Sequence, residues 1–111
     1  MSLDVYLTID AGGPDPVELF SANYTHNCNK MADVAGLYGI VWRPEENCIV
    51  TASDLISPLE TGIAAMEADP EKFRALNPDN GWGSYDTFIP WLRRYLDACR
   101  KFPRANVRAC R

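Results

Sequence analysis

Residues 85–102, YDTFIPWLRRYLDACRKF, decide the fold. Their apolar side chains recur at alternating spacings of three and four residues, which predicts a continuous apolar stripe along one helix. The stripe comprises Tyr85, Phe88, Ile89, Leu92, Tyr95, Leu96, Cys99 and Phe102. Because burial of one large side chain contributes roughly 1.5 to 3 kcal/mol, we expect this helix to be the main element packed against a sheet. Pro90 lies inside the pattern and predicts a kink, or a separate first turn from Ser84 to Ile89.

The beginning of the chain is typical of a β-hairpin. Residues 3–10 alternate apolar and polar side chains, which indicates a strand with one buried face. Residues 17–24 alternate in the same way after a turn rich in glycine and proline at 11–16. At the other end of the chain, residues 105–110 can add a third strand. The side chains of the first strand expected in the core are Leu3, Val5, Leu7 and Ile9.

A short helix is predicted directly after the hairpin. Thr25 can cap its start through the side-chain hydroxyl, and Gly36 offers a left-handed stop at its end. The apolar run at 37–42 is too short to assign by periodicity. Residues 48–50 are a brief strand candidate.

Two capping-box patterns indicate the next helix. They begin at Thr51 and Ser57, and they predict a helical turn at 52–56 that runs into a helix at 58–68. A further short turn is expected after Asp69. All these elements together predict a single α+β domain over residues 1–111, in which a small antiparallel sheet is covered on one face by about three helices.

Composition excludes several classes of protein. The chain has 111 residues, of which 47% are hydrophobic and 23% charged, so we expect one globular core rather than a disordered chain or a coiled-coil rod. No apolar run approaches the roughly 18 residues that a membrane span needs, and the first residues lack the pattern of a signal peptide. We therefore expect a cytoplasmic protein that does not bind membranes.

Charge is distributed unevenly along the chain. Residues 1–90 hold 4 Lys or Arg and 14 Asp or Glu, whereas residues 91–111 hold 7 Lys or Arg and 1 Asp. One interpretation is that the basic end lies beside acidic surface of the same domain, and the other is an anion-binding face. Duplex nucleic acid is not an expected partner, because the sequence pI is about 4.8.

The cysteines do not predict a metal site. Cys28, Cys48, Cys99 and Cys110 stand far apart, and the chain has a single histidine, His26. Structural zinc sites show closely paired ligands, so neither a metal nor another cofactor is expected. Residues two apart on a helix point to different faces, so the closeness of His26 and Cys28 in sequence does not make a catalytic pair.

Residues 23–30, NYTHNCNK, form the first candidate site, at the junction of a strand and a helix. A helix start offers unpaired N–H groups and a partial positive charge, which together can hold a carboxylate or phosphate. The alternative is that these side chains only cap the helix. The candidate ligand-binding residues are Asn23, Thr25, His26, Asn27 and Lys30, and His26 is the one candidate for a catalytic base.

Residues 80–85, NGWGSY, form the second candidate site. Glycines let backbone amides approach a ligand, and an indole can stack on a planar ring. A structural corner with the tryptophan folded onto the core is the alternative. If the two sites face one cleft, they suit a planar anionic ligand. The candidate residues here are Asn80, Gly81, Trp82, Gly83 and Ser84, with Trp42 and Arg43 on the same wall.

Several segments resemble parts of small uncharacterised proteins encoded in bacterial and phage genomes. They are residues 23–30, 42–46, 80–85 and 95–99, and the likeness extends over most of the chain. The resemblance implies a phage-type accessory protein. It implies no activity and no catalytic residue.

Three functions remain open from the sequence. The first is a non-enzymatic binding module for a small anionic, nucleotide-like ligand, favoured because no paired carboxylates, catalytic triad or phosphate loop is recognisable. The second is an accessory protein that acts only through protein–protein interaction, as an inhibitor or adaptor, with a protein partner or a second copy of itself. The third is a small hydrolase or transferase with His26 as its base.

Overall fold

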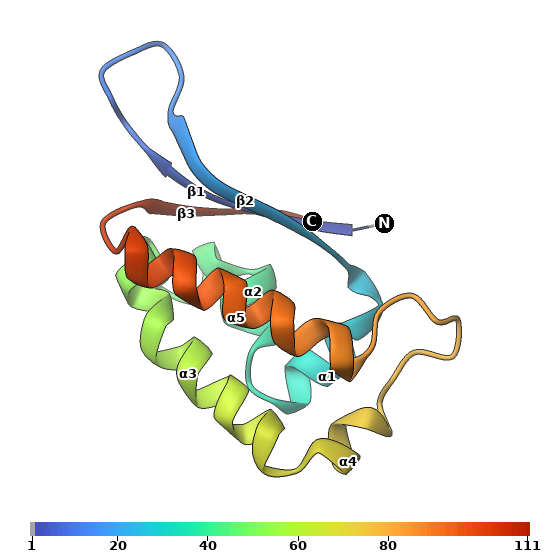
Figure 1. Cartoon of the computed structure of the whole chain (residues 1–111). Helices are drawn as coiled ribbons and strands as arrows, with labels where there is room; N and C mark the ends of the chain where they lie inside the picture. The colour runs from blue at the N-terminus through green and yellow to red at the C-terminus, as the bar shows by residue number, and fades with distance from the viewer. Residues whose placement is uncertain (1) are drawn as a thin grey trace.

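The computed structural model describes Ser2–Arg111 and contains a three-stranded antiparallel sheet (Figure 1). Strand β1 (Ser2–Ile9) lies in the middle, between β2 (Val17–Thr25) and β3 (Asn106–Cys110). The register pairs Val5 with Ala22 on one side and with Ala109 on the other. The predicted hairpin and terminal strand are therefore confirmed.

The helices cover one face of this sheet, which confirms the predicted α+β class (Figure 1). Two helices are long and three are short, and helix α5 lies between the sheet and α3. The 3-10 turns η1 and η2 connect the shorter elements. The bounds are η1 His26–Cys28, α1 Asn29–Val34, α2 Tyr38–Trp42, η2 Pro44–Glu46, α3 Ala52–Ala68, α4 Pro70–Arg74 and α5 Tyr85–Lys101.

Both long helices contain a proline and both continue through it. The expected separate first turn before Pro90 is wrong, because α5 is one helix from Tyr85. The two-part helix expected around Pro58 is likewise one helix, so its second capping box is not used. A proline removes the hydrogen bond to the carbonyl four residues earlier. Here those carbonyls belong to the exposed residues Asp54 and Asp86, so water can satisfy them.

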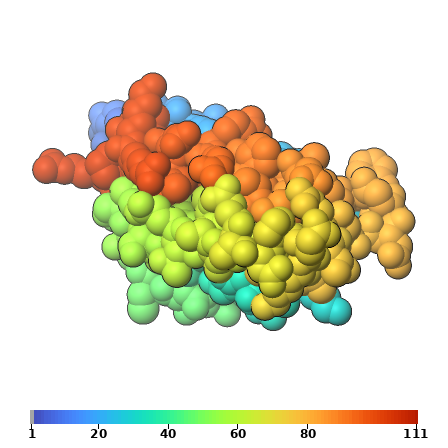
Figure 2. Space-filling model, turned by 60° about the horizontal axis from the view of Figure 1, so that its bottom comes forward, coloured from blue at the N-terminus to red at the C-terminus, as the bar shows by residue number. Residues whose placement is uncertain are grey.

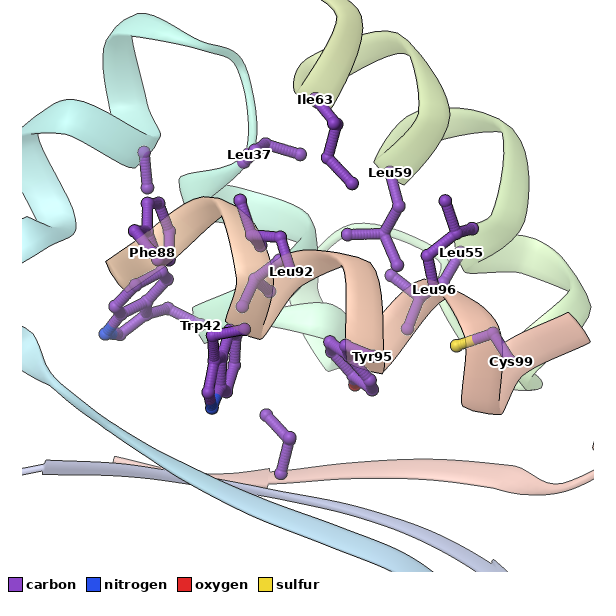
Figure 3. Close-up of a cluster of buried hydrophobic side chains, with 14 of the residues drawn as sticks. Leu37, Trp42, Leu55, Leu59, Ile63, Phe88, Leu92, Tyr95, Leu96 and Cys99 are labelled. Atoms are coloured by element: carbon purple, nitrogen blue, oxygen red, sulfur yellow. The ribbon is translucent and has the colours of Figure 1, made fainter. Parts of the chain in front are cut away.

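The core forms around the apolar stripe of α5 (Figure 3). Leu92 and Leu96 lie toward α3, while Tyr95 lies on the side of the sheet. Trp91, which the three-and-four spacing left out, is also buried. The buried stripe of α5 is wider than predicted because the helix packs against both the sheet and α3.

Two expectations about the strands are corrected. Ile9 was expected in the core but is 37% exposed, because the tip of the hairpin projects past the helices (Figure 1). Residues 48–50 do not form a strand. Cys48 has φ 60°, a left-handed conformation that breaks an extended run, and only an isolated bridge between Thr51 and Asn106 follows.

Part of the uneven charge is accounted for by the packing of the basic segment. Arg93 pairs with Glu67 and Arg100 with Glu60, so basic residues of α5 face acidic residues of α3. At the chain end, Arg111 lies 2.6 Å from Glu45. These contacts support the interpretation that the basic segment lies beside acidic surface of the same domain. All are exposed, so each contributes at most about 1 kcal/mol.

We predict that Gly62→Ala destabilises the fold although alanine is the better helix former. A methyl group at Gly62 would overlap the side chain of Leu37, which is fully buried and has no room to move. Overpacking of this kind costs about 1 to 3 kcal/mol. The measurement is the free energy of unfolding in urea. Gly13→Ala is the control, because nothing lies within 4 Å of the added methyl. Equal stability of the Gly62→Ala protein and the wild type would contradict this packing.

Candidate functional site

A hollow of about 630 Å³ lies where β2 ends and α5 begins. It brings together residues from both predicted helix entrances, which are more than fifty positions apart in the sequence. The segment before α5 lines one side of this hollow and projects from the body of the molecule (Figure 2). The hollow is lined by Ser2, Asn23, Tyr24, Thr25, Asn27, Asn80, Trp82, Gly83 and Thr87.

The Tyr24 hydroxyl joins the two sides of the hollow. It lies 2.7 Å from the Thr87 hydroxyl, donates to the Ser84 carbonyl at 3.3 Å and accepts from the Ser84 amide at 3.3 Å. Its ring stacks on Phe88, with 5.1 Å between the ring centroids. Burial raises the pKa of Tyr24 above its usual value, so the hydroxyl keeps its proton for these bonds. The end of β2 is thereby fixed to the first turn of α5.

The amides at both entrances are already partly bonded within the chain. The Ser84 side chain accepts from the Thr87 amide at 3.2 Å, and Asn77 accepts from the Tyr85 amide at 2.8 Å. At the other entrance the Thr25 hydroxyl accepts from the Asn27 amide at 3.2 Å. Donors that are engaged in capping are not free to bind an anion. Capping and ligand binding, which sequence alone treated as alternatives, therefore compete for the same groups.

The two glycines around Trp82 shape the wall of the hollow. Gly81 and Gly83 have φ of 75° and 89°, which residues with side chains rarely adopt. A methyl group on Gly83 would lie 2.6 Å from the Thr25 methyl carbon and 2.9 Å from the Cys28 sulfur, so the two entrances touch at this point. The Asn80 side chain accepts from the Trp82 amide at 2.9 Å and closes the turn. Trp82 is left 69% exposed, not folded onto the core.

Six of the predicted ligand residues do not line the hollow; they are His26, Lys30, Trp42, Arg43, Gly81 and Ser84. Lys30 lies at a separate depression of about 340 Å³, with Asn29, Asp33 and Tyr38. Trp42 is only 1% exposed and belongs to the core. Arg43 pairs with Glu46 at 2.7 Å. The positions of Lys30, Trp42 and Arg43 depend on how α1 and α2 rotate against the core, which local sequence does not determine.

His26 is bonded to the core rather than to the hollow. Its Nδ1 accepts a hydrogen bond from Trp42 Nε1 at 2.9 Å, and the residue is half-buried. A neutral imidazole has one nitrogen lone pair with which to act as a base, and here the indole occupies it. His26 is not among the residues that line the hollow. Its geometry is that of a residue that orients the Trp42 ring.

Sequence reasoning left out three residues that line the hollow. Ser2 reaches it through its register opposite Thr25, which only the assembled sheet defines. Tyr24 was left out because the sequence indicates that it is the last residue of the predicted strand at 17–24. Thr87 stands three positions after Ser84, a capping spacing that could have been recognised.

The cysteines and acidic residues form no metal site in Ser2–Arg111, because no three potential ligands gather there. The four cysteines are not linked by disulfides. Cys28 and Cys99 are buried, and burial raises the pKa of the Cys99 thiol to about 12. Such a thiol is inert as a nucleophile at neutral pH. Over the same described part of the chain, no helix has the length and apolar character to cross a membrane.

Comparisons with protein-family models, with curated proteins and with solved structures return no significant match. The function of the hollow therefore has to be argued from its own chemistry. The resemblance to phage-encoded proteins and the expected cytoplasmic location both stay predictions.

We predict that Tyr24→Phe loosens the junction at the hollow. The change removes the hydroxyl that bonds Thr87 and Ser84 and leaves their polar groups without that partner. The expected loss is about 1 to 2 kcal/mol in the free energy of unfolding, measured in urea. Tyr6→Phe is the matched control, because Tyr6 lies on the outer face of β1 beside Arg108. Losses of equal size in the two variants would show that the Tyr24 hydroxyl does not hold the junction.

Proposed function

We propose that this chain is a non-enzymatic binding module and that the hollow between β2 and α5 is its ligand site. The observation that carries the proposal is the meeting of both helix entrances at one concave surface, beside the exposed indole of Trp82. An exposed tryptophan next to a polar hollow is costly to leave in water and is useful for binding a ring.

The lining favours a ligand with a flat ring and several hydrogen-bonding groups. Its polar side chains are amides and hydroxyls, which both donate and accept, and none carries a charge. Trp82 supplies the face on which a planar ring stacks. A nucleotide-like ligand has both features.

The anionic character of the ligand has less support than its ring. Lys30, the expected cation, lies at the other depression. The positive charge that remains near the hollow is the N-terminal end of the α5 dipole, equivalent to roughly half a charge. The exposed carboxylate of Asp86, in the first turn of α5, opposes it. We therefore propose that the hollow recognises the ring and its neutral polar groups, and that a phosphate adds little.

Protein–protein interaction is the second candidate function. The exposed Trp82 favours it, because tryptophan is frequent among the residues that carry binding energy at interfaces. The hollow beside Trp82 is the reason we place a small ligand first. Nothing in the contacts of His26 adds support to the third candidate, a hydrolase or transferase.

The ligand proposal predicts that Trp82→Ala weakens binding of adenosine and of adenosine 5′-monophosphate by about 5- to 150-fold, because a stacked base contributes roughly 1 to 3 kcal/mol. Both affinities are measured by titration calorimetry or by NMR. The wild type should bind the two probes within about threefold of each other if the phosphate adds little.

Lys30→Ala is the control for this titration, since Lys30 is exposed and lies outside the hollow. We expect unchanged affinity in this variant. The proposal is contradicted if Trp82→Ala binds as the wild type does, or if neither probe binds at millimolar concentration.

A further inference from the structure

The sheet has one covered edge and one open edge. At the start of β3, the Val107 amide donates to the Val50 carbonyl at 2.9 Å on the outer side of the strand, and Thr51 forms a bridge with Asn106. Strand β2 forms the opposite edge, and in the described part of the chain no backbone group bonds to its outer side. Alternate residues of β2 therefore point unpaired N–H and C=O groups outward, while the others bond to β1.

From Phe20 to Thr25, strand β2 lacks the devices by which proteins protect an open edge. Its sequence, VELFSANYT, contains no proline and no lysine, and its one charged residue is Glu18 near the hairpin. The irregularity in its pairing with β1 also lies near the hairpin, between Leu7 and Thr8 of β1. From Phe20 to Thr25 the strand is regular and can pair with another strand.

A row of side chains on α5 runs beside this edge. Tyr24 stacks on Phe88, and Phe20 stacks on Tyr95 at 6.1 Å, so β2 runs antiparallel along α5 (Figure 1). Thr87 bonds the Tyr24 hydroxyl, which places it next to β2. Residues seven apart lie on the same side of a helix, so Arg94 and Lys101 continue the row from Thr87.

The two cations of this row have no acidic partner. Arg94 and Lys101 are exposed and form no ion pair within Ser2–Arg111, whereas Arg93 and Arg100 on the neighbouring face are paired with α3. The row therefore presents positive charge alongside open backbone groups. In an extended peptide added to β2, alternate side chains would all point toward α5. Carboxylates at those positions would meet Arg94 and Lys101.

We propose that the free edge of β2, together with Arg94 and Lys101, is a docking site for an extended acidic segment of a partner protein, which adds to the sheet as a fourth strand. A second copy of this chain fits less well, because its own β2 offers the single carboxylate of Glu18. This site goes beyond the proposed ligand hollow: it shares the end of β2 and Thr87 with the hollow, but it does not rest on the proposed ligand function.

The test uses a nine-residue peptide, acetylated and amidated, with Glu at every second position and Val or Thr between. A peptide with Lys in place of Glu is the charge control. Binding is followed by NMR shifts of the protein's backbone amides. We expect saturable shifts along β2 with the Glu peptide and not with the Lys peptide. Two further Glu peptides carry N-methyl groups, one on the odd-numbered residues and one on the even-numbered residues. Because only alternate amides of an added strand bond to β2, we expect only one of these two peptides to lose binding.

Variants of the protein test which of its charged residues recognise the Glu peptide. Arg94→Glu should weaken the Glu peptide by about fivefold, because attraction becomes repulsion at an exposed site. Arg108→Glu makes the same charge change on β3, the edge strand opposite β2, and should leave affinity unchanged.

Four results would overturn the proposal. They are no saturable binding of the Glu peptide, equal binding of the Lys peptide, equal binding of both N-methylated peptides, and equal weakening by Arg94→Glu and Arg108→Glu. Pairing of β2 with a second copy, detected as a dimer in sedimentation that excludes the peptide, would also overturn it.

Discussion

Burial of α5 on two sides at once is the interaction on which the rest of the structure depends. Its aromatic residues stack against β2 and the sheet, while Leu92 and Leu96 pack against α3. The Tyr85 hydroxyl also donates to the Met66 carbonyl of α3 at 3.3 Å. A helix held by two layers cannot slide along its axis without breaking both contacts. Its first turn is therefore placed at the end of β2 and cannot lie elsewhere.

The apolar packing of α5 places its first turn at the end of β2, and the polar hollow lies where these two ends meet. Where β2 ends and α5 begins, their amides and hydroxyls surround an open space together with Ser2 of β1 and the segment before α5. The same alignment brings the end of β2 to Thr87, from which the proposed docking site continues along α5 to Arg94. Both proposed sites thus arise from the contact between one strand and one helix, one at its end and one along its side.

The helices and strands with strong local periodicity could be predicted from the sequence. The way they pack against one another could not. The apolar spacing of α5 and the alternation of β1 were sufficient, because each depends on neighbours in the chain. The sequence left open whether Pro90 kinks this helix or follows a separate first turn, because the choice depends on whether the surroundings of the exposed residue Asp86 satisfy its carbonyl. Residues of both helix entrances, among them Asn23 and Trp82, do line one hollow. Lys30 does not, because the rotation of α1 is set by tertiary packing.

The central claim is that the two helix entrances meet, and the distance between Gly83 and Thr25 tests it most directly. These residues pack so closely that a Gly83 Cβ would lie 2.6 Å from the Thr25 methyl carbon. A nuclear Overhauser spectrum of the free protein should therefore show a strong cross-peak between a Gly83 Hα and the Thr25 methyl group. Absence of this cross-peak, with both resonances assigned and sharp, would contradict the account, because the start of α5 would then lie away from the end of β2.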